Sequence, residues 1–290
     1  MSLNTRSVKL RSSIRELKLS ETVRQFRFSN SVILSSSRAV RRATLHVRLI
    51  VGNTMAKISG SKARRNRIVC VVFDDGWKSQ LDALPVLDQY GFKATFGIIA
   101  GYVNNPLHNK YMNWQEIHNL RSQGHDIESH TLSHKCLEKL TETELRKEIM
   151  GSREIFQEQG IDTRILIYPL GIGGKNNRIR QALIEAGYLA ARTTIPSKFN
   201  LSSGDFLAVG AFEINRETTI KGFSKYLGGT GNSTVAILVY HRMGPEGVAI
   251  SQFKTQMAYL CKHNFKVKTM KQVLLEFCEK KQYSQRNSIN

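Results

Sequence analysis

The sequence has little of the chemistry that marks secreted or membrane-spanning proteins. Its four cysteines, at positions 70, 136, 261 and 278, are far apart and form no Cys-x-x-Cys pair. We therefore expect no disulfide framework, which favours a reducing compartment. No apolar run approaches the ~20 residues that cross a bilayer, and the run at 32–34 is too short for the core of a secretory signal. These absences predict a cytoplasmic protein without a transmembrane segment.

Acidic side chains are nearly missing from the first 67 residues, where Glu16 and Glu21 stand against 16 Lys and Arg. The rest of the chain holds 27 basic and 21 acidic side chains, so most of the formal charge of +20 belongs to the first segment. A basic arm can bind nucleic acid. This one has no interleaved aromatic residues and no recognisable nucleic-acid module, so we expect no nucleic-acid partner.

Residues 1–66 are also rich in Ser and Arg and show no sustained helical or strand period. This composition predicts a basic, disordered extension. Two other interpretations stay open, a leader peptide and an over-extended translation start with Met55 as the alternative beginning.

From residue 68, short apolar runs alternate with amphipathic patterns, and a polar tail follows at 282–290. We expect strands at 68–74, 94–100, 126–129, 165–168, 189–194, 208–214, 234–240 and 266–269. We expect helices at 81–90, 114–122, 141–159, 177–186, 219–226, 251–263 and 270–280. This alternation predicts an α/β domain over 67–281 with a parallel sheet, and the number of units favours a closed or distorted (β/α) barrel over an open sheet.

Polar residues follow several of the predicted strands, at the point where each strand ends. Asp74 and Asp75 follow the first strand, His130 the third, and His241 the last long one. In (β/α) barrels the carboxyl ends of the strands meet and carry the chemistry. The alternative is that the two aspartates only cap the next helix, but the convergence of these residues favours a functional site.

The spacing of His130 and His134 suits a shared divalent metal, because on a helical turn both imidazoles would project from one face. With Asp75 they would form an Asp-His-His site that leaves positions open for water, as catalytic metals require. Asp74 is then free to act as general base toward that water, and His241 is the candidate acid for the leaving group.

These residues stand in four segments that resemble, in order, motifs of the polysaccharide deacetylase family (the NodB-homology domain, of carbohydrate esterase type). The segments are Phe73-Asp-Asp-Gly76, His130-x-x-x-His134, Tyr168-Pro-Leu-Gly171 and Leu238-Val-Tyr-His241. The resemblance covers about residues 67–280. It implies a distorted (β/α)7 barrel that removes N- or O-acetyl groups from sugars or polysaccharides.

The same resemblance implies the roles of the site residues. Asp74 would be the catalytic base and His241 the acid, while Asp75, His130 and His134 would hold a divalent metal, zinc first and cobalt, nickel or manganese as alternatives. The substrate groove would be lined by Tyr168, Pro169, Leu170 and Gly171. A backbone N–H near Leu170 would help to hold the oxyanion.

The chain departs from the family pattern at two places. Many members carry an arginine that holds the base where this chain has Ile167, and Arg192 is one candidate replacement. The family also has a motif of the Asp-Trp type, which is not among the four segments above and is not recognisable in this chain. The sequence thus predicts a metal-dependent sugar deacetylase acting on an acetylated sugar or glycan. A non-catalytic carbohydrate-binding relative is the alternative, although all five catalytic positions are filled.

Overall fold

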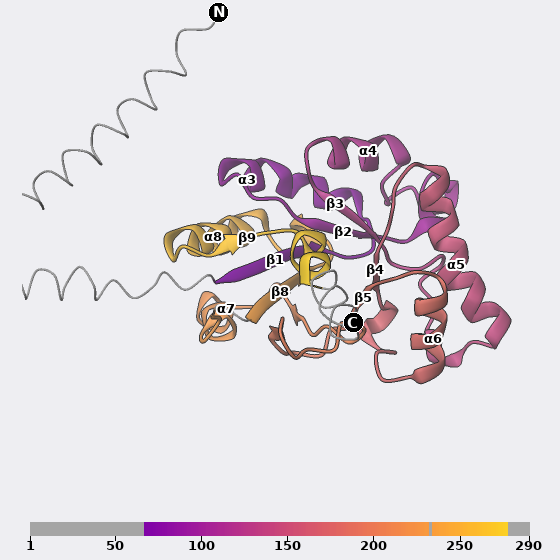
Figure 1. Cartoon of the computed structure of the whole chain (residues 1–290). Helices are drawn as coiled ribbons and strands as arrows, with labels where there is room; N and C mark the ends of the chain where they lie inside the picture. The colour runs from indigo at the N-terminus through magenta and orange to yellow at the C-terminus, as the bar shows by residue number, and fades with distance from the viewer. Residues whose placement is uncertain (1–66, 232–233, 278–290) are drawn as a thin grey trace, which may run out of the picture. The chain divides into compact units, whose positions relative to one another are not determined.

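One sheet that curls round itself organises the described part of the chain, residues 67–231 and 234–277 of the computed structural model (Figure 1). The strands are β1 (Ile68–Phe73), β2 (Thr95–Ile98), β3 (Asp126–Ser129), β4 (Ile165–Ile167), β5 (Ala190–Arg192), β6 (Phe199–Asn200), β7 (Phe212–Glu213), β8 (Thr234–Tyr240) and β9 (Lys266–Val267). The hydrogen-bonded order is β5-β4-β3-β2-β1-β8-β6, with β7 also on β8 and β9 also on β1. All pairings are parallel except that of β6 with β8.

Helices lie in most of the connections between the parallel strands, because parallel strands need a long crossover connection. They are α3 (Leu84–Gln89), α4 (Trp114–Ser122), α5 (Glu142–Glu158), α6 (Asn177–Glu185), α7 (Ile220–Leu227) and α8 (Ile250–Lys262). Short 3-10 segments are η2 (Lys78–Ala83), η3 (Ala100–Tyr102), η4 (Pro106–His108), η5 (Leu137–Lys139), η6 (Pro169–Gly171) and η7 (Gly244–Glu246). Residues 270–277 are also helical. The predicted extension 1–66 and tail 282–290 lie outside the described residues.

Most predicted elements are present. The strands expected at 94–100, 189–194 and 266–269 are shorter in the structure, and two other elements change more. The helix expected at 81–90 divides into η2 and α3 at Pro85, which occupies the first turn of α3, where a missing N–H costs nothing. The strand expected at 208–214 is reduced to β7. Its earlier residues still bond to the sheet edge, because Val209 donates its N–H to Ala191 and Thr193 donates to Val209.

That segment connects the two ends of the sheet. Val209 bridges to Arg192 of β5, and three residues later β7 pairs with β8. Backbone hydrogen bonds therefore run from β1 through β5 and residues 209–213 back to β8 and β1. The structure is thus an α/β fold with a curled, barrel-like sheet, as predicted.

The interior of the curl is apolar at its centre. Alternate residues of β1, Ile68, Cys70 and Val72, form one buried cluster with residues of β4, β5 and β8 and with three residues of the terminal helix. Because β1 and β4 are separated by two strands, their side chains can meet only inside the curl. Gly97 lets this interior close, since a Cβ there would lie 2.4 Å from the Ile167 Cδ1.

The opposite sides of the strands pack against the helices. Val69, Val71 and Phe73 belong to a second buried cluster with α3, α4 and α8, while α5 and α6 cover β4 and β5 in a third. Both sides of the parallel strands are therefore buried, which is why β1 and β8 read as continuous apolar runs.

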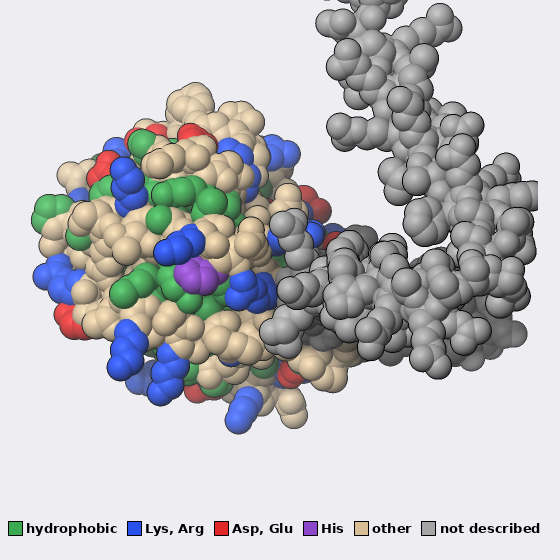
Figure 2. Space-filling view, turned by 90° about the vertical axis from the view of Figure 1, so that its left-hand side faces the viewer, with side chains coloured by type: hydrophobic (Ala, Val, Ile, Leu, Met, Phe, Trp, Pro, Cys, Tyr) green, Lys and Arg blue, Asp and Glu red, His purple; other side chains and the backbone are tan. Residues whose placement is uncertain are grey.

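Basic side chains are spread over the folded part as well. Figure 2 views the side on which α3, α7 and α8 lie, and shows Lys and Arg side chains among hydrophobic ones. The three described cysteines, Cys70, Cys136 and Cys261, are unpaired. Within the described residues, no helix has both the length and the apolar character that crossing a membrane requires.

His125 offers a test of how burial affects the stability of this fold. Its side chain is buried, and its Nδ1 accepts the Ala94 N–H at 3.1 Å. Burial, with Lys93 adding to it, lowers the pKa of His125 to about 4. Since a histidine in the unfolded chain titrates near ~6.5, the unfolded state binds more protons between these values. The free energy of unfolding should therefore fall as the pH drops through this window.

We predict that the His125→Asn variant loses less stability in acid than the wild type. Asn keeps an acceptor for the Ala94 N–H but does not titrate. Between about pH 7 and about pH 4.5, the variant should lose on the order of 2 kcal/mol less free energy of unfolding. Urea unfolding at the two pH values measures the difference, and equal losses in both proteins would contradict the assignment.

Candidate active site

Two adjacent carboxylates face the same end of the barrel because the chain turns between them. Asp74 continues the inward alternation of β1 and is buried. Asp75 has φ 76 and Gly76 has φ 85, both in the left-handed region. Asp tolerates this conformation better than most residues. The turn therefore brings Asp75 back to the edge that Asp74 occupies, which a regular strand would not allow.

Asp75 lies beside the two predicted histidine ligands. Its Oδ1 is 3.3 Å from Nε2 of His130 and 3.6 Å from Nε2 of His134. One ligand atom from each of these residues lies within 4.8 Å of the others. The Nδ1 of His130 is 2.9 Å from the Ile167 carbonyl oxygen, to which it can donate, and this bond turns Nε2 toward Asp75.

The backbone between the two histidines is not the helical turn on which their spacing would place both rings on one face. Residues 131–136 form an irregular loop, in which Thr131 has φ 67 and His134 has φ 57. The loop is held by Glu148 of α5, whose Oε2 accepts the Ser133 N–H at 2.8 Å. The imidazoles meet all the same, with ring centroids 4.7 Å apart.

The shifts in the pKa values of Asp75 and His134 favour the forms of these side chains that bind a divalent cation. Burial opposes ionisation of Asp75, but the hydrogen bond and charge of His130 outweigh it and hold the pKa of this carboxyl well below its ordinary value. Burial, and then the neighbouring His130, lower the pKa of His134. A carboxylate, as at Asp75, and a neutral imidazole, as at His134, are the donor forms that divalent metals bind. Trp77 donates to Asp75 Oδ2 at 2.9 Å and leaves Oδ1 for the ion.

Arg192 supplies the cation beside Asp74. Its Nη2 lies 2.6 Å from Oδ1 and also contacts Oδ2 of Asp74, and both side chains are buried. Arg192 is the direct partner of Ile167 in the pairing of β4 with β5. The guanidinium therefore sits one strand away from the position where many members of the family carry it. Sequence reasoning could name Arg192 only as a candidate, because the contact spans 118 positions.

His241 stands between Asp74 and a residue that the sequence prediction missed. Its Nε2 is 3.9 Å from Asp74 Oδ2, and its Nδ1 is 3.6 Å from Oε1 of Glu213. Glu213 ends β7, so it reaches the same edge as the other site residues. The sequence signal that could have identified Glu213 was its position near the end of the strand expected at 208–214. Gln80, also missed, donates to the backbone oxygens of Asp74 and His241.

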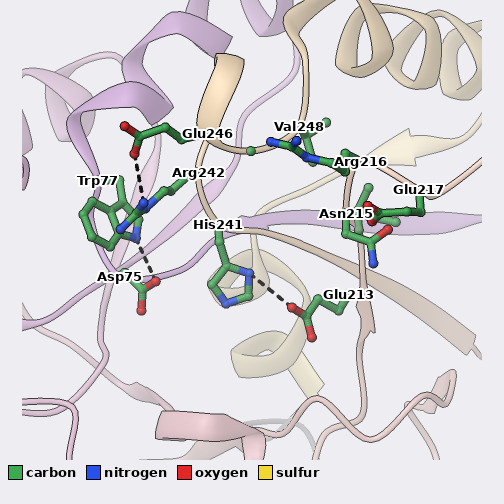
Figure 3. A pocket seen from close by; sticks show the side chains of 12 residues that line it. Asp75, Trp77, Glu213, Asn215, Arg216, Glu217, His241, Arg242, Glu246 and Val248 are labelled. Atoms are coloured by element: carbon green, nitrogen blue, oxygen red, sulfur yellow. Dashed lines mark hydrogen bonds and ion pairs between the residues drawn. The ribbon is translucent and has the colours of Figure 1, made fainter.

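A cleft of about 450 Å³ opens beside His241 (Figure 3). One wall is formed by Trp77, whose ring stacks on Tyr111 at 4.0 Å and carries the Arg242 guanidinium 3.9 Å from its ring centre. The opposite wall comes from residues 213–217, between β7 and α7. The volume falls within the range of small-molecule sites.

The four residues predicted to line a substrate groove differ in exposure. Leu170 has φ 58 and a side chain that is 61% exposed. Pro169 and Gly171 are buried. Tyr168 is also buried, and its hydroxyl donates to the Leu207 carbonyl at 2.9 Å. Only Leu170 therefore presents a side chain at this surface.

The curled sheet is the fold of a solved polysaccharide deacetylase structure, and part of the chain matches the model of that family. Residues 61–191 match the family model described as polysaccharide deacetylase. The resemblance is thereby confirmed over the region that holds the first three of the four motif segments.

Two curated relatives illustrate the match. YxkH of Bacillus subtilis, whose name assigns it to the polysaccharide deacetylases, is 30% identical over 149 residues, 51% of this chain and 52% of its own. The peptidoglycan-N-acetylglucosamine deacetylase of Bacillus cereus is 28% identical over 124 residues, 42% of this chain and 54% of its own. This chain thus matches about half the length of each.

The fold is shared by a solved structure of a Mycobacterium smegmatis protein whose name assigns it to the polysaccharide deacetylases. It aligns with a TM-score of 0.56 at 17% identity, covering 76% of this chain and 93% of the other. At this identity the likeness concerns the fold.

Proposed function

We propose that this protein is a metal-dependent hydrolase that removes an acetyl group from an N- or O-acetylated sugar or glycan. The observation that carries the proposal is the placement of three groups at one edge of the barrel. These are the Asp75-His130-His134 cluster, Asp74 held by Arg192, and His241 at 3.9 Å from Asp74.

The donor atoms of the cluster, one carboxylate oxygen and two imidazole nitrogens within 4.8 Å of one another, fit a divalent cation. A cation held by Asp75, His130 and His134 supplies Lewis-acid chemistry, polarising the acetyl carbonyl and making a water molecule more acidic. Zinc suits two imidazoles and one carboxylate. Cobalt, nickel and manganese are the alternatives to test.

Asp74 is proposed as the general base that takes the proton of the attacking water. The Arg192 guanidinium keeps its carboxylate oriented toward the site, and the buried position excludes competing solvent contacts. The water oxygen attacks the acetyl carbon as its proton passes to Asp74.

His241 is proposed as the acid that gives a proton to the leaving nitrogen or oxygen as the bond to the acetyl carbon breaks. Glu213, on the Nδ1 side, orients the ring so that Nε2 faces the reaction. The products are acetate and a free amine or hydroxyl. The leaving sugar then lies on the His241 side, where the cleft opens (Figure 3).

The experiment is acetate release from acetylated glucosamine oligomers and from O-acetylated sugars, with and without a chelator. The name of the Bacillus cereus relative makes N-acetylglucosamine units the first substrates to test. Chelation should abolish acetate release, and adding back zinc, cobalt, nickel or manganese should restore it. Unchanged release in the metal-stripped protein would contradict metal dependence, and no release from any substrate would favour a carbohydrate-binding relative.

A further inference from the structure

Several exposed aliphatic side chains of the described residues lie in connections that follow parallel strands. Six large hydrophobic residues are exposed in this part of the chain, and four of them stand in the connections after β2, β4 and β5: Leu107 after β2, Leu170 and Ile172 after β4, and Ile195 after β5. The carboxyl ends of these strands meet at the edge that carries the candidate active site. We call these four residues the apolar rim.

The rim residues are held in place by the loops that carry them. Leu107 is 89% exposed at the centre of η4, where the Asn105 side chain accepts its N–H at 3.0 Å and the flanking His108 ring stacks on Tyr102 at 3.7 Å. The connections after β4 and β5 touch each other, since Thr194 donates its N–H to the Gly171 carbonyl at 3.3 Å. The backbone that exposes these side chains is thus held by hydrogen bonds and ring stacking.

Lysine side chains are frequent in the connections near the apolar rim. The connections after β2, β3, β4 and β5 carry one acid, Glu138, and five lysines, namely Lys110, Lys135, Lys139, Lys175 and Lys198. The connections after β7 and β8 are balanced, with Arg216 and Arg242 against Glu217 and Glu246. Lys110 pairs with Glu246 at 3.6 Å and Lys198 donates to the Gly228 carbonyl after α7, so the basic excess beside the exposed aliphatic residues comes from Lys135, Lys139 and Lys175 against Glu138.

We propose that the apolar rim docks on an anionic lipid surface. Exposed aliphatic tips surrounded by lysine are the composition of proteins that bind in the headgroup region, where apolar groups insert and each Lys near an anionic surface adds attraction. A glycan polymer would be recognised by the faces of aromatic rings and by hydrogen bonds rather than by protruding Leu and Ile. A protein partner would leave the lysines without the dense negative charge they match.

Docking in this orientation would place the active-site edge against the surface. The consequence that the acetylated sugar is presented at a lipid surface rests on the proposed function. The binding itself does not, because Leu107 and Ile195 have no part in the proposed chemistry. The two ideas can therefore fail separately.

The test uses the full chain and vesicles of phosphatidylcholine with and without phosphatidylglycerol. The rim variant is Leu107→Ser with Ile195→Ser. Its control is Ile184→Ser, which removes an aliphatic side chain that is 57% exposed, against 51% for Ile195, from the end of α6 that precedes β5. The rim variant should bind anionic vesicles about tenfold more weakly or worse, since two buried aliphatic side chains are lost. The control should match the parent.

A second readout separates the rim from the basic segment 1–66, which can attract anionic vesicles by charge alone. In Leu107→Trp, the added indole should shift to shorter emission wavelength with anionic vesicles, whereas Ile184→Trp should show no such shift. The shift should persist at raised salt, which screens the charge contribution.

The proposal is overturned if the rim and control variants bind vesicles equally, or if the Leu107→Trp emission does not shift. It is also overturned if that emission responds to a soluble acetylated glycan and not to vesicles. Acetate release from a soluble substrate should be the same in the rim variant and the parent. If no substrate releases acetate while the rim still binds vesicles, the proposed function fails and the docking surface stands.

Discussion

Replacing His130 by alanine is expected to remove the bound metal and the acetyl hydrolysis together. His130 supplies one of three donor groups, and its Nε2 lies 3.3 Å from Asp75 Oδ1. Losing the ion forfeits several kcal/mol of transition-state stabilisation, so kcat/KM should fall on the order of 10³-fold or more. Metal content of the purified variant and acetate release under substrate-limited conditions measure the two effects.

A companion variant guards against simple loss of folding. His130 is buried, and its removal leaves the Ile167 carbonyl without its partner, which costs about 1–3 kcal/mol of stability. His134→Ala should lose metal and activity equally but lose less stability, because His134 is only partly buried. A full complement of metal in both variants would rule out the proposed ligand set.

The Asp74→Asn variant is expected to keep the metal and lose turnover. Asn has nearly the shape of Asp but cannot take a proton, so kcat should fall roughly 10²–10⁴-fold. Metal content by elemental analysis should stay at the parent value. If the metal leaves with the activity, Asp74 is a ligand and the division of roles between Asp74 and Asp75 is wrong.

The contact with Arg192 adds a stability effect that the sequence prediction did not contain. Asn in place of Asp74 leaves a buried guanidinium without its counter-charge, and removing one partner of a buried pair costs about 3–5 kcal/mol. The double variant Asp74→Asn with Arg192→Met removes both charges and should recover much of this loss. If the double variant regains stability but not turnover, the loss of activity belongs to the missing base and not to unfolding.

The elements that the sequence predicted well are those with local signals. The capping box from Asn113 to Glu116 sets the start of α4, and Thr141 with Glu144 does the same for α5. The continuous apolar runs of β1 and β8 indicated strands buried on both sides. Each of these signals acts within a few residues, so no knowledge of the tertiary structure was needed.

The predictions that failed or fell short depend on distant contacts or backbone conformation. The spacing of His130 and His134 suits a helical turn, but residues 131–134 form a loop with two left-handed residues, and Glu148 of α5 holds its backbone. The strand expected at 208–214 keeps only β7, since its first half bonds to β5 and its second half to β8. A sequence pattern does not show such a change of partner.

By itself, the sequence determined which residue types stand at the ends of the strands, and so the order of the site motifs and their resemblance to polysaccharide deacetylases. Only the tertiary structure decided which side chains meet there. Register places Arg192 beside Ile167, so that its guanidinium reaches Asp74, and β7 brings Glu213 to His241. These contacts join residues that are far apart in the chain, and they form because parallel strands bring their carboxyl ends to one edge, where a buried charge is stable only beside its opposite.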